Sequence, residues 1–139
     1  MIEQIFSQPI AVPLAGARAA VVETASFWTF DEAAASFTQI IPSLPTTNQA
    51  VTLLSNGFVL LAGGVDEVAG VPQPAILTVD ANLGAVYPAG MLTVARTLAS
   101  AVTLNDGSVL IAGGRDANNN PLASAEVFRM EERRRAASH

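Results

Sequence analysis

Two stretches of the sequence carry the same order of residue types, and this internal repeat limits the fold more than any other feature. Each copy has an apolar run, a turn dipeptide, a second apolar run, a pair of glycines and an aspartate, with one extra residue in the turn of the first copy. The copies are 50–53, Asn56-Gly57, 59–62, Gly63-Gly64 and Asp66, and then 101–104, Asp106-Gly107, 109–112, Gly113-Gly114 and Asp116. Each copy should be one supersecondary unit that buries its apolar surface against a neighbouring unit.

Both copies predict β-structure. Asn-Gly and Asp-Gly favour tight hairpin turns because these residues tolerate a positive φ angle. The flanking runs are rich in Val, Ile and Leu and lack the 3.6-residue spacing of a helix. Since the runs are continuously apolar and do not alternate with polar residues, we expect strands that are covered on both faces, as in stacked sheets.

Weaker copies of the other strands extend the repeat. A strand at 77–80, a turn at Gly84 and a strand at 85–87 complete the second unit, and segments 28–31 and 36–38 match this pair earlier in the chain. Residues 14–16 match the glycine-ended strand of the first unit, although Pro13 is unfavourable for pairing there. The last unit continues through 125–128.

These features predict an all-β fold, a partial β-propeller of about 2.5–3 four-stranded antiparallel blades. The expected blades are a degenerate one with three strands at 9–39, a full one at 46–88 and a third with three strands at 97–129, followed by a charged tail at 130–139. A closed propeller needs about four to eight blades. The chain is then a fragment of a longer propeller, a protomer that completes a ring as a homo-oligomer, or a short stack that needs a partner.

Segment 91–128 resembles the kelch-repeat family, including its bacterial branch related to the galactose-oxidase propeller. The resemblance rests on Met91, Arg96 at the start of a strand, the turn, the di-glycine, and Glu126 followed two residues later by Phe128. The second unit keeps the di-glycine but has Leu77 and Val79 in place of the Glu and the aromatic residue. The positions to which the resemblance gives a structural role are Gly57, Gly63, Gly64, Arg96, Gly107, Gly113, Gly114, Glu126 and Phe128.

Charge and composition exclude several classes of function. Residues 1–128 hold ten acidic residues against three arginines, a formal charge of −7, so this body repels nucleic-acid phosphates. The absence of cysteine excludes disulfides and thiolate metal sites. No apolar run approaches the ~20 residues of a membrane span, and residues 1–4 lack the features of a secretory signal. The chain as written is expected to stay inside the cell, although a parent protein could be secreted.

Two polar features have alternatives to a structural role. The di-glycines could cradle a phosphate, but neither precedes a helix with the Lys and Ser or Thr of a P-loop, which favours strand-end glycines. Asp116, Asn118 and Asn120 alternate as at the start of a calcium loop, but the sixth position is Pro121 and the twelfth is Val127. This pattern favours a solvated turn. We predict no bound metal and no cofactor.

The charged and aromatic residues are also interpreted as structural. Arg96 and Glu126 are expected to form a charge-assisted contact within or between blades. Trp28 and Phe30 are expected to pack in the core, with an aromatic ligand platform as the alternative. The Glu- and Arg-rich run at 131–135 is typical of a solvated, disordered end, with an interaction arm as the alternative.

No catalytic residue is predicted. The copper chemistry in the resembled family needs a cysteine-crosslinked tyrosine, a second tyrosine and two histidines, whereas this chain has no cysteine, one tyrosine (Tyr87) and one histidine (His139). The carboxylates of Asp66 and Glu67 have no sequence neighbour that would polarise them. We therefore expect a non-catalytic scaffold whose loops at 65–74 and 115–124 face a protein or carbohydrate partner. The alternative is a structural fragment of a larger galactose-oxidase-like propeller with no activity of its own.

Overall fold

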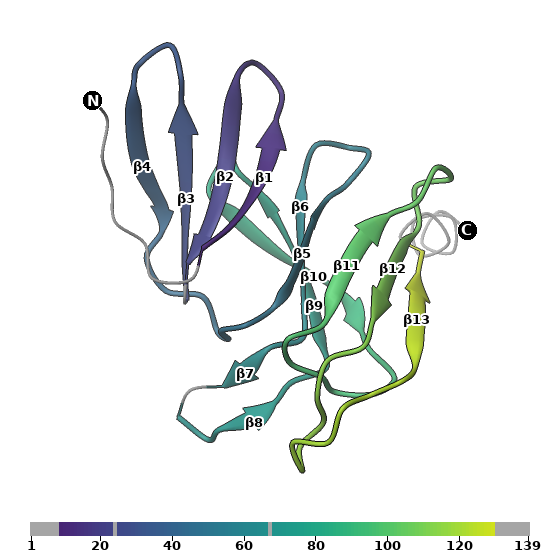
Figure 1. Cartoon of the computed structure of the whole chain (residues 1–139). Coiled ribbons are helices and arrows are strands. Elements are labelled where there is room, and N and C mark those ends of the chain that lie inside the picture. The colour runs from purple at the N-terminus through teal and green to yellow at the C-terminus, as the bar shows by residue number, and fades with distance from the viewer. Residues whose placement is uncertain (1–8, 24, 67, 130–139) are drawn as a thin grey trace.

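The structure is a computed structural model that describes residues 9–23, 25–66 and 68–129 (Figure 1). These residues form strands and turns, and the all-β class expected from the sequence is confirmed. Among the described residues no helix is long and apolar enough to cross a membrane. The strands are β1 (Ile10–Leu14), β2 (Arg18–Glu23), β3 (Ser26–Asp31), β4 (Ser36–Ile41), β5 (Ala50–Leu53), β6 (Val59–Ala62), β7 (Val65–Asp66), β8 (Val71–Pro72), β9 (Ala75–Asp80), β10 (Ala85–Met91), β11 (Ser100–Thr103), β12 (Val109–Ala112) and β13 (Ala125–Phe128).

Three antiparallel sheets follow one another along the chain. The first sheet has the order β1-β2-β3-β4, the second β5-β6-β9-β10 and the third β11-β12-β13. A separate two-stranded hairpin, β7-β8, interrupts the second sheet between β6 and β9. Strand β5 contacts both β1 and β11, so the sheets meet along their first strands with the second sheet in the middle (Figure 1).

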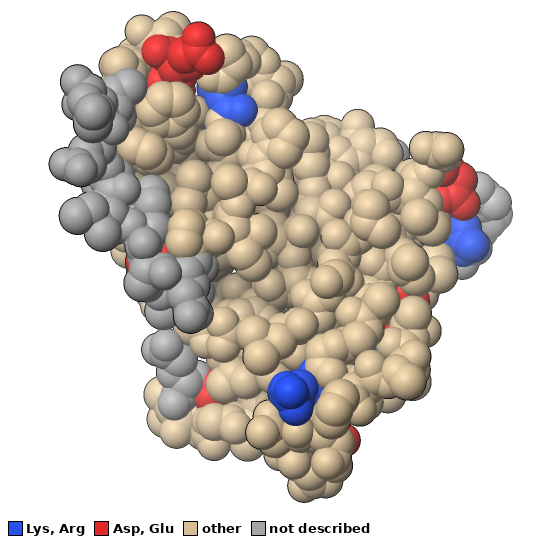
Figure 2. Space-filling model, viewed as in Figure 1, with Lys and Arg blue, Asp and Glu red and all other residues tan. Residues whose placement is uncertain are grey.

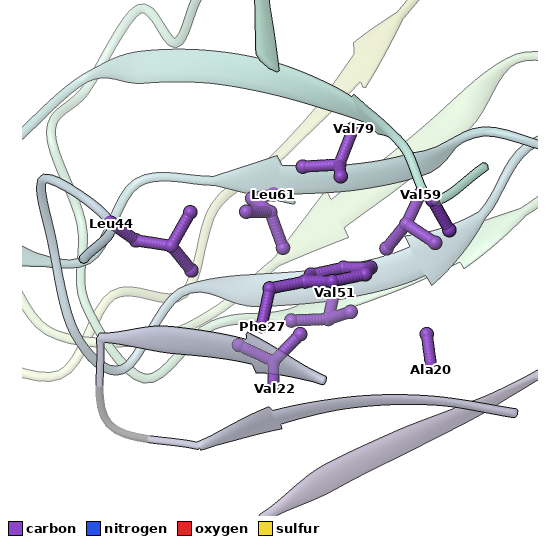
Figure 3. Close-up of a cluster of buried hydrophobic side chains, with 9 residues drawn as sticks. Ala20, Val22, Phe27, Leu44, Val51, Val59, Leu61 and Val79 are labelled. Atoms are coloured by element: carbon purple, nitrogen blue, oxygen red, sulfur yellow. The ribbon is translucent and has the colours of Figure 1, made fainter. Parts of the chain in front are cut away.

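The second sheet is buried on both faces. One face contributes Val51 and Val59 to a cluster with Phe27 of β3, and Figure 3 shows the Phe27 ring extending toward these two valines. The opposite face contributes Leu60 to a cluster with Ile111 of β12. All four residues of β6 are buried. The continuously apolar run at 59–62 thus has the coverage on both faces that the sequence predicts.

Hydrogen bonds hold the second and third sheets together near their first strands. The hydroxyl of Thr103 donates to the carbonyl oxygen of Leu53 at 2.6 Å, and its Oγ1 lies 3.1 Å from Oγ1 of Thr52. The N–H of Gly64 donates to the carbonyl oxygen of Arg96 at 2.9 Å. These contacts fix the two sheets relative to each other independently of the apolar core.

The hairpins of the second and third sheets align differently from the match made on sequence. The N–H of Leu54 donates to the carbonyl oxygen of Phe58 at 2.8 Å, and the N–H of Leu104 donates to that of Ser108 at 2.8 Å. Leu54 therefore corresponds to Leu104, and the two turns have the same length. The extra turn residue expected from matching 50–53 with 101–104 is wrong. Because a shift of one residue reverses the face of a strand, this correction decides which side chains are equivalent.

The first sheet has four strands, whereas the sequence led us to expect three. Gly16, with a φ of 77°, lies in the turn between β1 and β2. It corresponds to the hairpin glycine Gly57 and not to the di-glycine, so the match of 14–16 with a glycine-ended strand is wrong. Pro13 pairs with Ala19 in β1, which is an edge strand and so can accommodate a residue without an N–H.

Candidate functional site

Arg96 and Glu126 form a buried ion pair in the third sheet. Arg96 Nη2 lies 3.1 Å from Glu126 Oε2, and the two side chains are 0% and 18% exposed. The guanidinium also donates to the carbonyl oxygens of Gly113 at 3.0 Å and Ser124 at 2.9 Å, and to Ser124 Oγ at 3.1 Å. The contact suggested by the sequence is thus formed, but Arg96 lies in the segment between β10 and β11 and does not open a strand as expected. Its contacts tie the start of β13 to the end of β12.

The carboxylate of Glu126 is held in its charged form. Burial raises its pKa. The N–H groups of Thr93 at 2.6 Å and Val94 at 3.0 Å, followed by the charge of Arg96, lower the pKa by more than burial raises it. The pKa of Glu126 therefore lies below its ordinary value of 4.5. A carboxyl group with a depressed folded-state pKa stabilises the fold above its unfolded pKa, and this contribution is lost as the pH falls through the folded value.

We expect Glu126→Gln to remove this part of the acid sensitivity. Urea unfolding of the wild type and the variant, measured from about pH 6 to about pH 3, should give a stability difference that shrinks toward the acid end. The difference should begin to shrink near the ordinary pKa of 4.5. Other carboxyl groups titrate in both proteins and cancel in the comparison. A difference that is constant over the whole range would contradict the depressed pKa.

The repeat glycines determine the path of the chain. All six have a positive φ: Gly57 (89°), Gly63 (70°), Gly64 (96°), Gly107 (88°), Gly113 (73°) and Gly114 (88°). At the second glycine of each pair there is also no room for a side chain. A Cβ at Gly64 would lie 2.5 Å from the carbonyl oxygen of Thr47, and one at Gly114 would lie 2.5 Å from that of Thr97. Neither pair precedes a helix, so the described structure places no phosphate loop here.

Phe128 attaches the third sheet to the outermost strand of the second. Its ring lies so close to Gly90 in β10 that a Cβ on this glycine would be 2.6 Å from the ring. Sequence reasoning missed Gly90. The available signal was a glycine inside a strand, which often marks a close approach of another group.

The two loops expected to face a partner lie at the same end of the sheets (Figure 1). In the first, Val65 pairs with Pro72 to form the β7-β8 hairpin. In the second, Asp116 Oδ1 accepts the N–H groups of Asn118 at 2.9 Å and Asn120 at 3.0 Å. The carboxylate thus accepts hydrogen bonds from the backbone of its own loop, as is common for aspartate in exposed turns. The described residues hold no group of three or more His, Cys, Asp or Glu side chains suited to a metal.

The face of the third sheet that points away from the second sheet is exposed, whereas the equivalent face of the second sheet is buried. Leu110 pairs with Val127 as Leu60 pairs with Thr78. Leu60 is 0% exposed and Thr78 is 2% exposed, and Leu60 belongs to the cluster that contains Ile111 of the third sheet. Val127 and Val102, which pair with Leu110 from its two sides, are 49% and 50% exposed. The described residues thus leave an apolar sheet face open, which we call the outer face.

Trp28 and Phe30 of β3 are half-buried and contact other side chains. The rings of Phe30 and Phe37 have centroids 4.9 Å apart, and Trp28 Nε1 donates to Ser26 Oγ at 3.0 Å. The Oδ1 of Asp66 accepts the N–H of Val68 at 2.9 Å. Three other predicted features, namely Glu67, the run at 131–135 and His139, lie outside the described residues.

The described residues on the face seen in Figure 2 show no concentrated charge. Figure 2 shows small, scattered charged patches on the viewed face, with broad uncharged areas between them. A comparison with models of known protein families finds no match, and a comparison with curated protein sequences finds none either.

Proposed function

We propose that this chain is a non-catalytic binding scaffold, built from kelch-type propeller blades, and that its outer face docks a further sheet. The observation that carries this proposal is the exposure of Val102 and Val127 on a face that is buried in the second sheet. In a stack of like units, each unit has one face for the preceding unit and one for the following unit. The described residues cover only the first of these faces in the third sheet.

The arrangement within each sheet supports the kelch-type assignment. The strands of each large sheet are antiparallel and run outward in chain order from a first strand that contacts the neighbouring sheet. The third sheet carries the di-glycine, the Arg96–Glu126 pair and Phe128 at the positions implied by the resemblance. Each of these residues fixes a strand end or an intersheet contact.

The partner that we favour is a second copy of this chain. The described residues of two copies would hold six large sheets, within the range of about four to eight in closed propellers. Repeat equivalence pairs the outer face with the far face of the first sheet of the other copy. There Ala19 and Phe30 are paired as Val59 and Val79 are in the second sheet, and this valine pair packs on the first sheet. The contact is heterologous, and it forms a closed ring when the rotation between copies allows.

The chemistry of the outer face favours a protein partner over a carbohydrate. The side chains on it are Val102, Leu110 and Val127 together with the small residues Ser100, Ala112 and Ala125. None of these side chains carries a charge. Carbohydrates are held by convergent hydrogen-bonding groups, whereas the centres of protein interfaces are apolar and poor in charge.

We expect the wild type to be a dimer and Val102→Asp/Val127→Asp to be a folded monomer. Light scattering coupled to size exclusion gives the mass, and circular dichroism of the same fractions reports the fold. The dissociation constant should rise at least about a hundredfold, because docking would bury two unpaired carboxylates. Leu83→Asp, at a turn residue that is 73% exposed, is the matched control and should stay dimeric. A wild type that is folded and monomeric at every concentration would contradict the proposal.

A structural fragment of a larger galactose-oxidase-like propeller is the second candidate. The same exposed face favours it, since the covering sheet could belong to the same polypeptide. In that case the isolated chain should aggregate or fail to fold, and adding neighbouring blades should restore a soluble β-sheet protein. A well-folded dimer formed by this chain alone would exclude the fragment.

A further inference from the structure

A cavity of about 150 Å³ lies at the loop end of the second sheet. It is lined by Thr46, Gly63, Ala75 and Leu77, together with Asp66 and Gln73 of the loop that contains β7 and β8. Pockets for drug-sized ligands are typically about 300–1,000 Å³. This cavity is therefore too small for such a ligand and has the size needed for a single side chain.

The corresponding place in the third sheet is filled by Arg96. The N–H of Gly63 donates to the carbonyl oxygen of Ala75 at 2.9 Å, and the N–H of Gly113 donates to that of Ser124 at 3.1 Å. Gly63 and Ala75 are thus the counterparts of Gly113 and Ser124. In the third sheet these two counterparts are the residues whose carbonyl oxygens accept the guanidinium of Arg96.

The second sheet lacks the ion pair. Leu77 occupies the position in β9 that Glu126 occupies in β13, as the pairing with β6 and β12 shows. Thr46 lies fifty positions before Arg96, the same spacing as between the two hairpin turns. Two long charged side chains are replaced by a hydroxyl and a leucine, and the cavity is the space that the arginine would fill.

The cavity keeps the acceptors that hold the guanidinium in the third sheet. The hydroxyl of Thr46 donates to the carbonyl oxygen of Gly63 at 3.0 Å, as Arg96 Nη1 does to that of Gly113 at 3.0 Å. A carbonyl oxygen has two lone pairs, so this one can accept a further hydrogen bond. Asp66 and Leu77 are both lining residues. The Oδ1 of Asp66 caps its own loop, which leaves Oδ2 as the oxygen for a cation.

We propose that this cavity binds an alkylguanidinium group, presented as an arginine side chain by a partner protein. The aliphatic stem lies along Leu77, and the guanidinium donates to the carbonyl oxygens of Gly63 and Ala75 and pairs with Asp66. A planar fork of donors suits such convergent acceptors better than the compact ammonium of lysine does. The site lies on the second sheet and does not depend on docking at the outer face.

The test uses three probes, each titrated into the isotope-labelled full chain and followed by NMR. They are acetyl-Gly-Arg-Gly-amide, the same peptide with neutral citrulline in place of arginine, and propylguanidinium. The arginine peptide and propylguanidinium should shift the amide signals of Gly63 and Ala75, with dissociation constants on the order of millimolar. The citrulline peptide should bind at least about tenfold more weakly.

Each departure from this result overturns part of the proposal. Equal binding of the citrulline peptide would exclude a cation site, and binding of propylguanidinium without the arginine peptide would exclude a protein side chain as the ligand. No shift with any probe would exclude the site altogether. Shifts that leave Gly63 and Ala75 unaffected would place the binding elsewhere and also overturn it.

Substitutions test whether the cavity itself is the site. Thr46→Arg/Leu77→Glu supplies the residues of the third sheet, fills the cavity and should abolish binding. Asp66→Asn keeps the oxygen that caps its own loop, and it should raise the dissociation constant of the arginine peptide about fivefold to tenfold. Thr38→Arg, at an exposed position in β4, raises the net charge by one as Asp66→Asn does, and it should bind the arginine peptide like the wild type. Wild-type affinity in a folded Asp66→Asn variant would remove the carboxylate from the site.

Discussion

Arg96→Ala is expected to lower the free energy of unfolding by about 3–5 kcal/mol, as when one partner of a buried ion pair is removed. The Arg96 side chain is 0% exposed, and the Glu126 side chain whose charge it leaves behind is only 18% exposed. The carbonyl oxygen of Gly113 loses a donor as well. Domains of this kind are stable by about 5–15 kcal/mol, so the loss is a large share of the total. Urea unfolding followed by circular dichroism measures it.

Two further variants separate the ion pair from general effects of removing an arginine. Arg129 and Asp106 are also 3.1 Å apart, but their side chains are 49% and 58% exposed, so Arg129→Ala should have a far smaller effect. Arg96→Thr/Glu126→Leu installs the pair found at Thr46 and Leu77 of the second sheet. It should be less destabilising than Arg96→Thr alone, because no charge remains unpaired. If Arg96→Ala cost no more than Arg129→Ala, the structural role of the buried pair would be wrong.

The sequence predicted the features of the fold that follow from local chemistry. Asn56-Gly57 and Asp106-Gly107 form the hairpin turns because their glycines adopt φ angles of 89° and 88°. The continuously apolar run at 59–62 is buried on both faces, because a sheet lies on either side of β6. The Arg96–Glu126 contact was also expected, because both residues stand at positions to which the resemblance gives a structural role and their charges are opposite.

The features that the sequence did not predict depend on pairing between distant segments. The two copies share the letters Ala-Val-Thr-Leu one residue out of register, and the strand pairings together with the hydrogen bonds of Leu54 and Leu104 show the true alignment. The fourth strand of the first sheet was missed because a short turn joins β2 to β3, whereas in the second sheet a long loop that contains β7 and β8 joins the equivalent strands β6 and β9. The cavity could not be foreseen, because its lining comes from segments that are far apart in the sequence.

Gly114→Ala is expected to destabilise the chain by roughly 3–5 kcal/mol, at the upper end of single substitutions. Two costs combine there. The residue has a φ of 88°, which is strained for any residue with a Cβ, and the new Cβ would lie 2.5 Å from the carbonyl oxygen of Thr97 and 3.0 Å from the backbone nitrogen of Ala99. Both obstacles are backbone atoms, so the third sheet can relieve the clash only by moving its strand end. Thermal and urea unfolding by circular dichroism would measure the loss.

Gly57→Ala separates the two costs. Gly57 has nearly the same φ, 89°, but nothing lies within 4 Å of a Cβ built there. Its substitution should therefore cost only the backbone strain, about 1–2 kcal/mol. A clear excess for Gly114→Ala would mean that the di-glycine is needed for the close approach of two chain segments as well as for its φ angle. Equal losses would mean that the segment at Thr97 moves aside at little cost, and that backbone conformation alone accounts for the glycine pair.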